Sequence, residues 1–467
     1  MRISYLFALI PLAITLACGS TSNTVSPLQT TPTDSAAPLP DVDSDAGALP
    51  ESDASLPSRE LAKGVWSLDS EMLAANDADL APLGRLMQGA EVVGIGETWH
   101  TTGGQHQMRA RAVRYLVEHE GFRHVMLETP WITALPLTRY VATGENLKGG
   151  IASIFGVFAS THMRDLMVWL RAWNVAHPTD AVQFHGFDVQ ENAEESVALK
   201  TYVRRGTTAA RADALLAFLP DCYCGAYSNT TECFASPDAA LSNGSGGTFP
   251  PARDASCKAG LDALDQAFQN DKAMWVSASS EQQWKEAVHV AKALRAGHET
   301  ETIQDAIEGG YMRRDEAMKT NVLAFGTLYG PAKAVLMAHN GHLERSPNAA
   351  LFRAGGSNPS GAMMGGRLYS ALGAKYKVIG QVAYDIKINW PGMSGGPRLN
   401  TNANSIEKAL EALARPYLLV DALDNAVTEP NKVYTTDTQG VFGKFVPAVS
   451  FDALLFMHRT DAMVYAR

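Results

Sequence analysis

The sequence predicts an α/β protein with a central parallel or mixed sheet that is flanked by many helices. Short continuous apolar runs recur along the chain, and longer segments with helical spacing of apolar residues separate them. Strands that alternate with helices form parallel pairs, because each helix returns the chain to the edge where the previous strand began. Polar residues follow several of these apolar runs directly, and ligands bind beyond the carboxyl ends of such strands. We therefore expect a functional site at this edge of the sheet.

Length and composition indicate a globular protein with one large core or two domains. The chain has 467 residues, of which 46% are hydrophobic and 19% are charged, and its formal net charge is −10. A pI near 5.7 and the lack of a basic run argue against nucleic acid as a partner.

The N-terminus has the features of an export signal. Arg2 precedes an apolar segment at residues 5–16, which is too short to cross a bilayer as a helix. Cys18 ends this segment and resembles the lipidated residue of a bacterial lipoprotein box, although Thr15 stands where Leu is usual. We expect residues 1–18 to be a signal peptide and Cys18 to be lipidated, with an ordinary cleaved signal as the alternative.

Export with lipidation would anchor the protein in the periplasm, at the outer membrane or at the cell surface. Without lipidation the protein would be periplasmic or secreted, and membrane contact is expected only through the lipid anchor. Residues 19–58 are rich in Ser, Thr, Pro, Asp and Ala and have almost no large apolar side chains. Such a segment cannot bury enough surface to fold, so we expect a disordered tether. Residues 59–467 then form the catalytic domain, with an insertion at about 206–275.

The elements of this domain follow from the spacing of the apolar residues. Continuous apolar runs predict strands at 92–95, 125–127, 182–184, 334–337, 377–384, 418–420 and 453–456. Apolar residues three and four positions apart predict helices at 77–87, between the first two strands up to Gly121, and at 131–143, 161–176, 281–296, 313–328, 367–373 and 405–413.

Four cysteines lie close together in the insertion, namely Cys222, Cys224, Cys233 and Cys257. An even, clustered set in an exported protein predicts two disulfides that staple the insertion. Zinc is the alternative, but the spacing lacks paired CxxC motifs and no histidine lies among the cysteines. A bridge between Cys222 and Cys224 would be strained, so each is expected to reach Cys233 or Cys257, and the pairing stays open.

Polar side chains gather after four of the predicted strands. Glu97 and His100 occupy the turn after the strand at 92–95, and Glu128 follows the strand at 125–127. These three side chains lie near one another if the two strands are neighbours. The remaining candidates follow the third and fourth strands or lie on the first helix, and they are His185, Asp188, His339, His342 and Arg109.

Each candidate alone has a purely structural explanation. A histidine at a strand end is usually a hydrogen-bonding residue, Glu97 could cap the following helix, and Arg109 could form a structural ion pair. Packing alone does not usually gather carboxylates and imidazoles at several strand ends, so together they indicate a site. A histidine beside a carboxylate is the usual general base that activates water.

Two further roles are open for the same residues. His339 and His342 could polarise a carbonyl group or protonate a leaving alkoxide. Alternatively, a divalent metal could be bound by ligands from the set Glu97, His100, Glu128, His339 and His342. The chain has no GxSxG elbow in a strand–turn–helix context, no Walker motif and no complete dinucleotide glycine loop. A serine nucleophile is therefore not expected.

Five segments resemble, in order, the motifs of one known family. They are GIGETWH at 94–100, GFDVQ at 186–190, RDEAMKTN at 314–321, AHNGH at 338–342 and FDALLF at 451–456. Together with Arg109 and Glu128 they resemble the erythromycin esterase family over about residues 60–465. The resemblance implies a largely helical α/β hydrolase, unrelated to the serine-triad enzymes, that cleaves a macrolide lactone or another ester by direct attack of water.

The resemblance also implies roles for individual residues. His100 would correspond to the general base, and Glu97, Arg109, Glu128, His339 and His342 would surround it in the catalytic pocket. We expect His185 and Asp188 to contact the substrate, a small-molecule ester or lactone. This interpretation requires no cofactor, and metal-dependent hydrolysis is the alternative. Exported haem-binding lipoproteins share the strand-GExH start, so haem or ligand binding without turnover is a further alternative.

The chain departs from the family pattern in two places. The family has an acidic residue shortly after the histidine of the first motif, whereas Gly103, Gly104 and Gln105 occupy that region here. The cysteine-rich insertion is not a feature that we associate with the resistance enzymes. Both departures argue against a macrolide substrate, and hence against antibiotic resistance, more than against hydrolysis.

Overall fold

The computed structural model describes residues 59–190, 193–222, 251–302, 310–351, 361–389, 398–438 and 441–466. The predicted signal peptide, Cys18, the tether at 19–58, Cys224 and Cys233 lie outside these residues. Within the described part of the chain, no helix is both long enough and apolar enough to cross a membrane.

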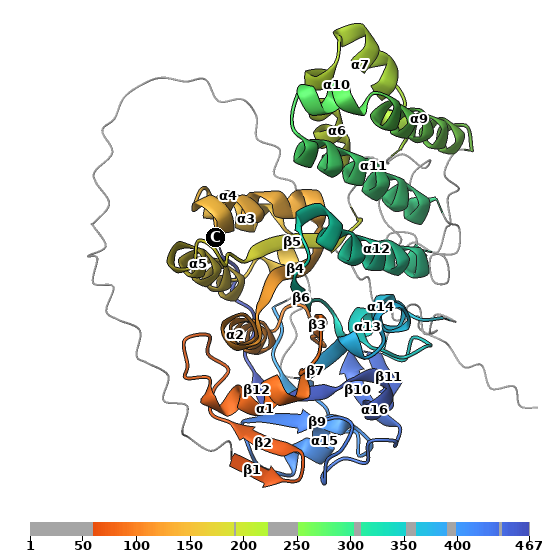
Figure 1. Cartoon of the computed structure of the whole chain (residues 1–467). Helices are drawn as coiled ribbons and strands as arrows, with labels where there is room; N and C mark the ends of the chain where they lie inside the picture. Colours follow the sequence, from red (N-terminus) through yellow and green to blue (C-terminus); the bar gives the residue numbers. More distant parts are fainter. Residues whose placement is uncertain are drawn as a thin grey trace, which may run out of the picture.

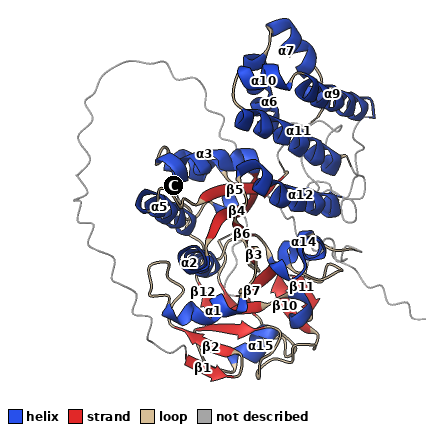
Figure 2. Cartoon of the chain, viewed as in Figure 1, coloured by secondary structure: helices blue, strands red, loops and turns tan. Residues whose placement is uncertain are grey.

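A ten-stranded mixed sheet forms the centre of the molecule, with helices on both sides (Figures 1 and 2). Along the sheet the strands are β1 (Arg59–Ala62), β2 (Val65–Leu68), β9 (Tyr417–Asp421), β12 (Ala453–Thr460), β7 (Tyr376–Ile386), β3 (Val92–Ile95), β6 (Lys333–Met337), β4 (Phe122–Pro130) and β5 (Gln183–Asp188), and β8 (Arg398–Leu399) pairs with β7. The strands from β12 to β5 are parallel, whereas the pairs made by β1, β2, β8 and β9 are antiparallel. The predicted fold class is confirmed.

The central strands are apolar because helices cover both of their faces. In β3 every residue is buried, and alternate side chains enter two different core clusters. Val92 packs in the cluster with α6 (Ala193–Gly206), α11 (Glu281–Glu301), α12 (Tyr311–Tyr329), α14 (Met364–Leu372) and α15 (Ile406–Glu411). Val93 packs in the cluster with α1 (Ala81–Leu86), α2 (Gly103–Glu120), α3 (Trp131–Thr143), α4 (Leu147–Ser153) and α5 (Thr161–Ala176). A hairpin of β10 (Tyr434–Thr438) and β11 (Val441–Phe445) and the short helices α13 (Asn340–Leu343) and α16 (Pro447–Ser450) complete this part of the fold.

The order of the strands differs from the expectation in one respect that matters for the site. The sequence argument placed Glu97 and Glu128 close together on the condition that β3 and β4 are neighbours, but β6 lies between them and pairs with both. β4 and β5 also extend beyond the predicted runs, so that Glu128 and Asp188 lie within strands rather than after them. The end of α2 is as predicted, since Gly121 adopts the left-handed conformation (φ 72°) that glycine permits at a helix C-terminus.

The chain between β5 and β6 forms a helical lobe beyond the β5 edge of the sheet (Figure 1). It contains α6, α7 (Ala209–Leu216), α9 (Pro251–Asn270), α10 (Lys272–Ser277) and α11, and α12 connects it to the sheet. A disulfide joins Cys222 to Cys257 on α9, which confirms one of the two expected bridges. The buried ring of His298 on α11 contacts the Cys222 carbonyl oxygen at 3.0 Å and Asp254 of α9 at 2.9 Å.

Loss of this disulfide should destabilise the protein. The bridge closes a loop of 35 residues. In the chain-entropy model, closing a loop of that size raises the free energy of the unfolded chain by about 3–4 kcal/mol. We expect the double variant Cys222→Ala with Cys257→Ala to lose about that much free energy of unfolding in urea titrations. Reductant should bring the wild-type protein to the stability of the variant. A wild-type protein whose stability reductant leaves unchanged would contradict the expectation.

Candidate active site

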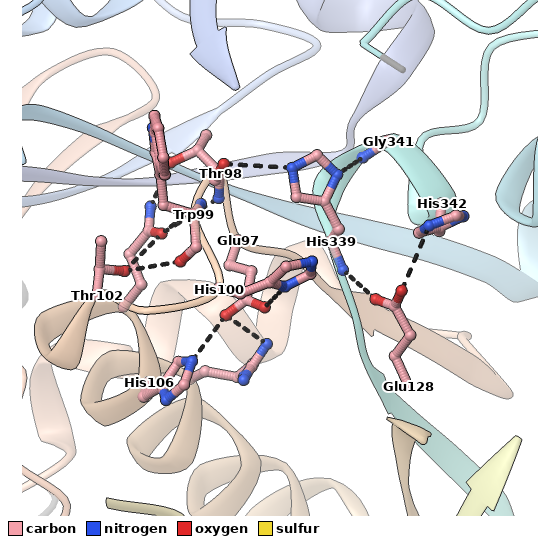
Figure 3. Close-up of polar contacts among 12 residues, drawn as sticks. Glu97, Thr98, Trp99, His100, Thr102, His106, Glu128, His339, Gly341 and His342 are labelled. Carbon is pink, nitrogen blue, oxygen red and sulfur yellow. Dashed lines mark hydrogen bonds and ion pairs between the residues drawn. The ribbon is translucent and has the colours of Figure 1, made fainter. Parts of the chain in front are cut away.

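The candidate residues meet at the carboxyl ends of β3, β6 and β4. Glu97 and His100 lie in the turn after β3, His339 and His342 follow β6, and Glu128 lies in β4. Because β6 is the middle strand, its two histidines lie between the groups from β3 and β4. Figure 3 shows His100 between Glu97 on one side and His339 with Glu128 on the other. The strand order that sequence reasoning missed is therefore what assembles the cluster.

Gln105 holds the turn that carries Glu97 and His100. Its side-chain oxygen accepts hydrogen bonds from the backbone N–H groups of Thr98 at 3.2 Å and Trp99 at 3.3 Å, and from the Thr102 hydroxyl at 2.9 Å. Its amide nitrogen donates to the Thr98 hydroxyl at 2.8 Å. Gln105 therefore ties the turn to the start of α2.

The Glu97 carboxylate is fully buried and has three cationic or N–H partners (Figure 3). Its Oε1 lies 2.7 Å from Nδ1 of His100, and its Oε2 lies 3.0 Å from Nε2 of His106 and 3.1 Å from Nη1 of Arg109. Burial alone would raise the pKa of Glu97, but Arg109 and the two histidines outweigh burial and hold this pKa well below its usual range. Glu97 is therefore a fixed anion beside His100.

His100 is the most exposed of the catalytic candidates, although only 9% of its surface is accessible. The edge of its ring meets the ring of Phe158, with centroids 5.3 Å apart, and the His339 ring lies 5.5 Å away. Phe158 therefore forms an apolar wall beside the imidazole, and the His339 ring is its other aromatic neighbour. A small molecule that reaches this cluster would meet His100 first.

Glu128 lies opposite Glu97 and is buried with its own set of donors. Its Oε1 lies 2.9 Å from Nη2 of Arg314 and 3.3 Å from Nε2 of His342, and its Oε2 accepts the backbone N–H of His339 at 2.8 Å. Burial opposes ionisation, but the charges on His342 and Arg314 are stronger and lower the pKa of Glu128 to about 2. The cluster thus contains two permanently ionised carboxylates.

His342 bridges two carboxylates. Its Nδ1 lies 3.0 Å from both carboxylate oxygens of Asp315. Its Nε2 lies 3.3 Å from Oε1 of Glu128 and 3.2 Å from Nη1 of Arg314, which can only donate. Burial would lower the pKa of His342, but Asp315 and Glu128 together raise it. The charge of Arg314 acts in the opposite direction, but the net effect is a raised pKa for His342.

His339 has a different environment from His342. Its Nδ1 accepts the backbone N–H of Gly341 at 3.1 Å, and its Nε2 lies 3.2 Å from the carbonyl oxygen of Thr98. These contacts assign the proton to Nε2, which donates to Thr98. Burial, together with the charges of His100 and His342, lowers the pKa of His339 to about 3. His339 is therefore a neutral ring that connects α13 to the turn after β3 through hydrogen bonds.

Asp188 belongs to the cluster through Arg314, which sequence reasoning left out of the site. Arg314 on α12 donates from Nε and Nη2 to the two oxygens of Asp188 at 2.9 and 2.7 Å, while Nη2 also reaches Glu128. Asp188 is fully buried, so its role here is to hold Arg314 rather than to face solvent. The signal for Arg314 and Asp315 was present in the RDEAMKTN segment. His106 and Gln105 had no comparable signal.

The structure does not bring His185 into this cluster. Its buried ring stacks between Phe325 and Tyr329 of α12, with centroids 4.6 and 4.5 Å away, and it lies 5.4 Å from His124. Burial, with a smaller contribution from His124, lowers the pKa of His185 to about 3, so the ring is neutral. It packs as an aromatic residue of the core.

We therefore expect His185→Phe to keep turnover within about threefold of the wild-type value, a change in barrier below ~1 kcal/mol. Phenylalanine can occupy the same stack between Phe325 and Tyr329. Steady-state kinetics on any substrate that the protein turns over would test this. A tenfold or larger rise in KM would return His185 to the substrate-binding residues.

Several possible metal-ligand atoms of the cluster already have cationic or backbone partners. The Arg109 and Arg314 guanidinium groups already lie against Glu97 and Glu128, and both ring nitrogens of His339 face backbone groups. Among the described residues, one group of three side chains has metal-ligand atoms that all lie within 4.8 Å of one another. It consists of Asp77, Glu118 and His119 and lies outside the cluster. Arg114 contacts both of those carboxylates as well, at 3.3 and 3.4 Å.

Solved structures with the same fold are known. A protein from Bacillus cereus is 20% identical and superposes with a TM-score of 0.71 over 87% of this chain and 97% of its own. A succinoglycan biosynthesis protein is 17% identical, with a TM-score of 0.65 over 86% and 96% of the two chains. A mutant of erythromycin esterase EreC in its open conformation is 16% identical, with a TM-score of 0.62 over 85% and 98%.

The sequence profile of one family, described as erythromycin esterase, matches residues 117–460. This range includes the segments with Glu128, Arg314 and His342. It begins after the turn with Glu97 and His100, whose place in the cluster rests on the geometry given above. The match covers most of the chain, and the chain therefore belongs to the erythromycin esterase family and is a hydrolase of that family.

Proposed function

We propose that the protein hydrolyses carboxylic esters or lactones and that His100 is the general base that activates water. The observation that carries this proposal is the 2.7 Å contact between Nδ1 of His100 and Oε1 of Glu97. Because Glu97 is ionised, it can only accept this hydrogen bond, so the proton of a neutral His100 lies on Nδ1. Nε2 is then the ring nitrogen that carries the lone pair and can accept a proton from water.

The other charged groups of the cluster support the remaining steps. Water would attack the carbonyl carbon of the substrate and pass a proton to Nε2 of His100. This addition turns the carbonyl group into a tetrahedral oxyanion. The bond from that carbon to the alcohol oxygen would then break, and the departing alkoxide would take a proton from the His100 imidazolium or from His342. His342 suits the second role because Asp315 and Glu128 favour its protonated form. Arg109 and His339 would position Glu97 and the turn.

The substrate class in this proposal is a small molecule with an ester or lactone bond. The catalytic side chains are almost fully buried, with 0% exposure for Glu97, 3% for Glu128 and 2% for His342. Access therefore requires some movement around His100 and Phe158. The similar EreC structure is of an open conformation, which supports an opening of this kind. The proposal requires no metal, because guanidinium groups already neutralise the two carboxylates.

Export is part of the proposal. It is supported by the sequence of residues 1–18, with Cys18 as the lipidated residue, and by the disulfide between Cys222 and Cys257. Disulfides persist in oxidising compartments such as the bacterial periplasm. Labelling with a fatty-acid analogue in the producing cell, compared with Cys18→Ser, would test the lipid anchor. Equal labelling of both proteins would contradict it.

The proposed reaction can be tested on a panel of p-nitrophenyl esters, simple lactones and erythromycin, with and without a chelator. We expect turnover of at least one substrate and no loss with the chelator. Loss with the chelator would favour a metal-dependent hydrolase. No turnover, together with a Soret band on haem titration, would favour the haem-binding alternative.

A single-turnover reaction in ¹⁸O-labelled water would then test direct attack by water. With excess enzyme, direct attack places the solvent label in the product acid in the first turnover. A mixed anhydride between the acyl group and Glu97 or Glu128, opened by water at the glutamyl carbonyl, would instead deliver an unlabelled enzyme oxygen to the product acid. An unlabelled product acid in the first turnover would therefore indicate a nucleophilic mechanism and contradict the general-base mechanism.

A further inference from the structure

Two consecutive residues of α12 contact the two different nitrogens of the His342 ring. Arg314 donates from Nη1 to Nε2 of His342 at 3.2 Å, and both carboxylate oxygens of Asp315 lie 3.0 Å from Nδ1. The three side chains are buried, with 5% exposure for Arg314, 0% for Asp315 and 2% for His342. One helix therefore holds the imidazole in a single orientation, with Nδ1 turned toward Asp315 and Nε2 turned toward Arg314.

Asp315 is itself held in place from two sides. Its Oδ1 accepts the backbone N–H of Met364 at 2.6 Å, which is the first residue of α14. The preceding residue, Arg314, donates from Nε and Nη2 to the two oxygens of Asp188 on β5. Because a helix N-terminus favours a negative charge, the start of α14 suits an ionised Asp315. The carboxylate therefore has a fixed place beside the ring.

The contact with Asp315 assigns a proton to Nδ1 of His342. A carboxylate has acceptor atoms only, so the nitrogen must be the donor in this hydrogen bond. Burial lowers the pKa of His342, and the charge of Asp315 is the largest of the effects that raise it. Asp315 thus stabilises the protonated ring as well, and in both protonation states of His342 the proton on Nδ1 stays in place.

The surroundings of Nε2 suit both protonation states of the ring. Nε2 lies between Nη1 of Arg314 at 3.2 Å and Oε1 of Glu128 at 3.3 Å (Figure 3 shows the contact with Glu128). In the neutral ring, the lone pair of Nε2 accepts from Arg314. In the protonated ring, the positive charge lies beside the Glu128 carboxylate. Nε2 is therefore the nitrogen at which His342 can lose and regain a proton.

We propose that Asp315 is a positioning residue that keeps a proton on Nδ1 of His342, so that Nε2 is the nitrogen that protonates an alkoxide leaving group. This inference rests on the proposed function, in which His342 is one of two proton donors to the departing alkoxide. It goes further, because it assigns the donor atom and restricts the role of Asp315 to substrates whose leaving group needs a proton.

The protons balance over the reaction. Water adds its hydroxyl group to the carbonyl carbon and gives its other proton to His100. The bond between that carbon and the alcohol oxygen then breaks, the electron pair stays on the oxygen, and this oxygen takes the Nε2 proton of the protonated His342. The ring is left neutral, with its remaining proton on Nδ1. Exchange with solvent afterwards removes a proton from His100 and returns one to His342.

The variant Asp315→Asn removes the charge and changes the hydrogen bond. Its amide oxygen can still accept the N–H of Met364, but its amide nitrogen would donate to Nδ1 and favour the ring proton on Nε2. An ethyl ester releases a basic alkoxide that needs a proton, whereas the p-nitrophenyl ester of the same acid releases a stable anion. We expect kcat to fall about 10²-fold on the ethyl ester and to stay within about threefold on the p-nitrophenyl ester.

Two further variants test whether Asp315 acts through His342. His342→Asn should show the same difference between the two esters, and adding Asp315→Asn to it should cause no further loss, because the two residues act as a unit. Equal losses on both esters in Asp315→Asn, or no loss on either, would overturn the inference. Losses that multiply in the double variant would overturn it as well.

Asp452→Asn is the matched control for Asp315→Asn. Asp452 is a buried carboxyl group (6% exposed) outside the cluster. It also combines a backbone N–H with a cationic side chain, since its oxygens accept from the N–H of Val378 at 2.8 Å and from Nη1 of Arg345 at 3.1 Å. Asp452→Asn should therefore keep turnover of both esters within about threefold of the wild-type values.

NMR of ¹⁵N-histidine-labelled protein reports the tautomer of His342 without any substrate. His342→Asn identifies the signal, and in the neutral wild-type ring the proton should lie on Nδ1. A wild-type ring with its proton on Nε2 would overturn the inference, even if Asp315→Asn does not fold. Turnover of both esters that survives in His100→Asn would instead remove the proposed function itself, so the two failures are distinguishable.

Discussion

The variant His100→Asn should lose at least ~10² in kcat on any ester or lactone that the protein hydrolyses. Asparagine can place its amide N–H where Nδ1 of histidine lies, so the hydrogen bond to Glu97 and the folded turn are retained. What the variant lacks is the second ring nitrogen, which is the proposed proton acceptor. A positioned general base contributes about 10²–10⁴ in rate, and the whole of that contribution should disappear.

A second histidine serves as the control for this measurement. His177 follows α5, where its ring stacks on Trp173 at the surface with centroids 3.8 Å apart. His177→Asn should keep full turnover. Stopped turnover in His100→Asn with an unchanged urea midpoint would support the general base. A folded His100→Asn variant with wild-type turnover would require a different base, and His342 would be the next candidate.

Local chemistry made the turn around Glu97 and His100 predictable from sequence. The apolar run ends at Gly96, and a Cβ at this position would meet Oδ1 of Asn340 at 1.8 Å. Glycine is thus required where α13 packs against the turn, and the polar residues that follow lie at the strand end as expected. The end of α2 at Gly121 was predictable for a similar reason, since glycine readily adopts positive φ.

The pairing of strands was not predictable in the same way. β3 and β6 pair through Val92 and Ala334, which are far apart in sequence, and no local pattern encodes that partnership. The positions of His106 and Gln105 relative to Glu97 depend on how α2 leaves the turn, which is set by contacts with the C-terminal segment, residues 461–466. Spacing in the sequence therefore identified the ends of the strands, but not the residues of α2 that contact the side chains there.

His185 shows that a histidine after a predicted strand can lie outside the cluster. It follows the predicted strand at 182–184 as His339 follows the one at 334–337, so the pattern gave the two residues equal weight. In the structure Phe325 and Tyr329 enclose its ring, and its neighbour in the motif, Asp188, is the residue that reaches the cluster through Arg314. Residue type and position at a strand end cannot distinguish these two environments, because the distinction depends on which side chains of α12 pack opposite.

Replacing Arg314 by Met should destabilise the protein by about 3–5 kcal/mol, the usual cost of removing one partner from a buried ion pair. Arg314 is 5% exposed and lies against the buried carboxylates of Asp188 and Glu128. Methionine can fill much of the space, so the loss is electrostatic rather than a matter of cavity volume. Urea denaturation followed by circular dichroism measures the effect.

A surface pair provides the comparison. Arg204 and Asp213 are 2.7 Å apart, but their side chains are 58% and 61% exposed, and such pairs contribute about 0–1 kcal/mol. Arg204→Met should therefore have little effect. Adding Asp188→Asn to Arg314→Met should recover part of the stability, because one uncompensated charge is removed. Strictly additive losses in this double-mutant cycle would show that Asp188 and Arg314 are not coupled.

The effect of Arg314→Met should also depend on pH, with a sign that follows from Glu128. In the folded protein burial raises the pKa of Glu128, but His342 and Arg314 more than offset burial and lower it to about 2. A glutamate in the unfolded chain has a pKa of about 4.3. The stabilisation linked to this shift is therefore present above about pH 4.3 and is lost as the pH falls toward the folded value. The variant lacks part of this linkage, so the two urea midpoints should differ most near neutral pH and approach one another in acid. A difference that stays constant from pH 7 to pH 3 would mean that Arg314 stabilises the fold through packing, and that the ionised state of Glu128 depends on His342 instead.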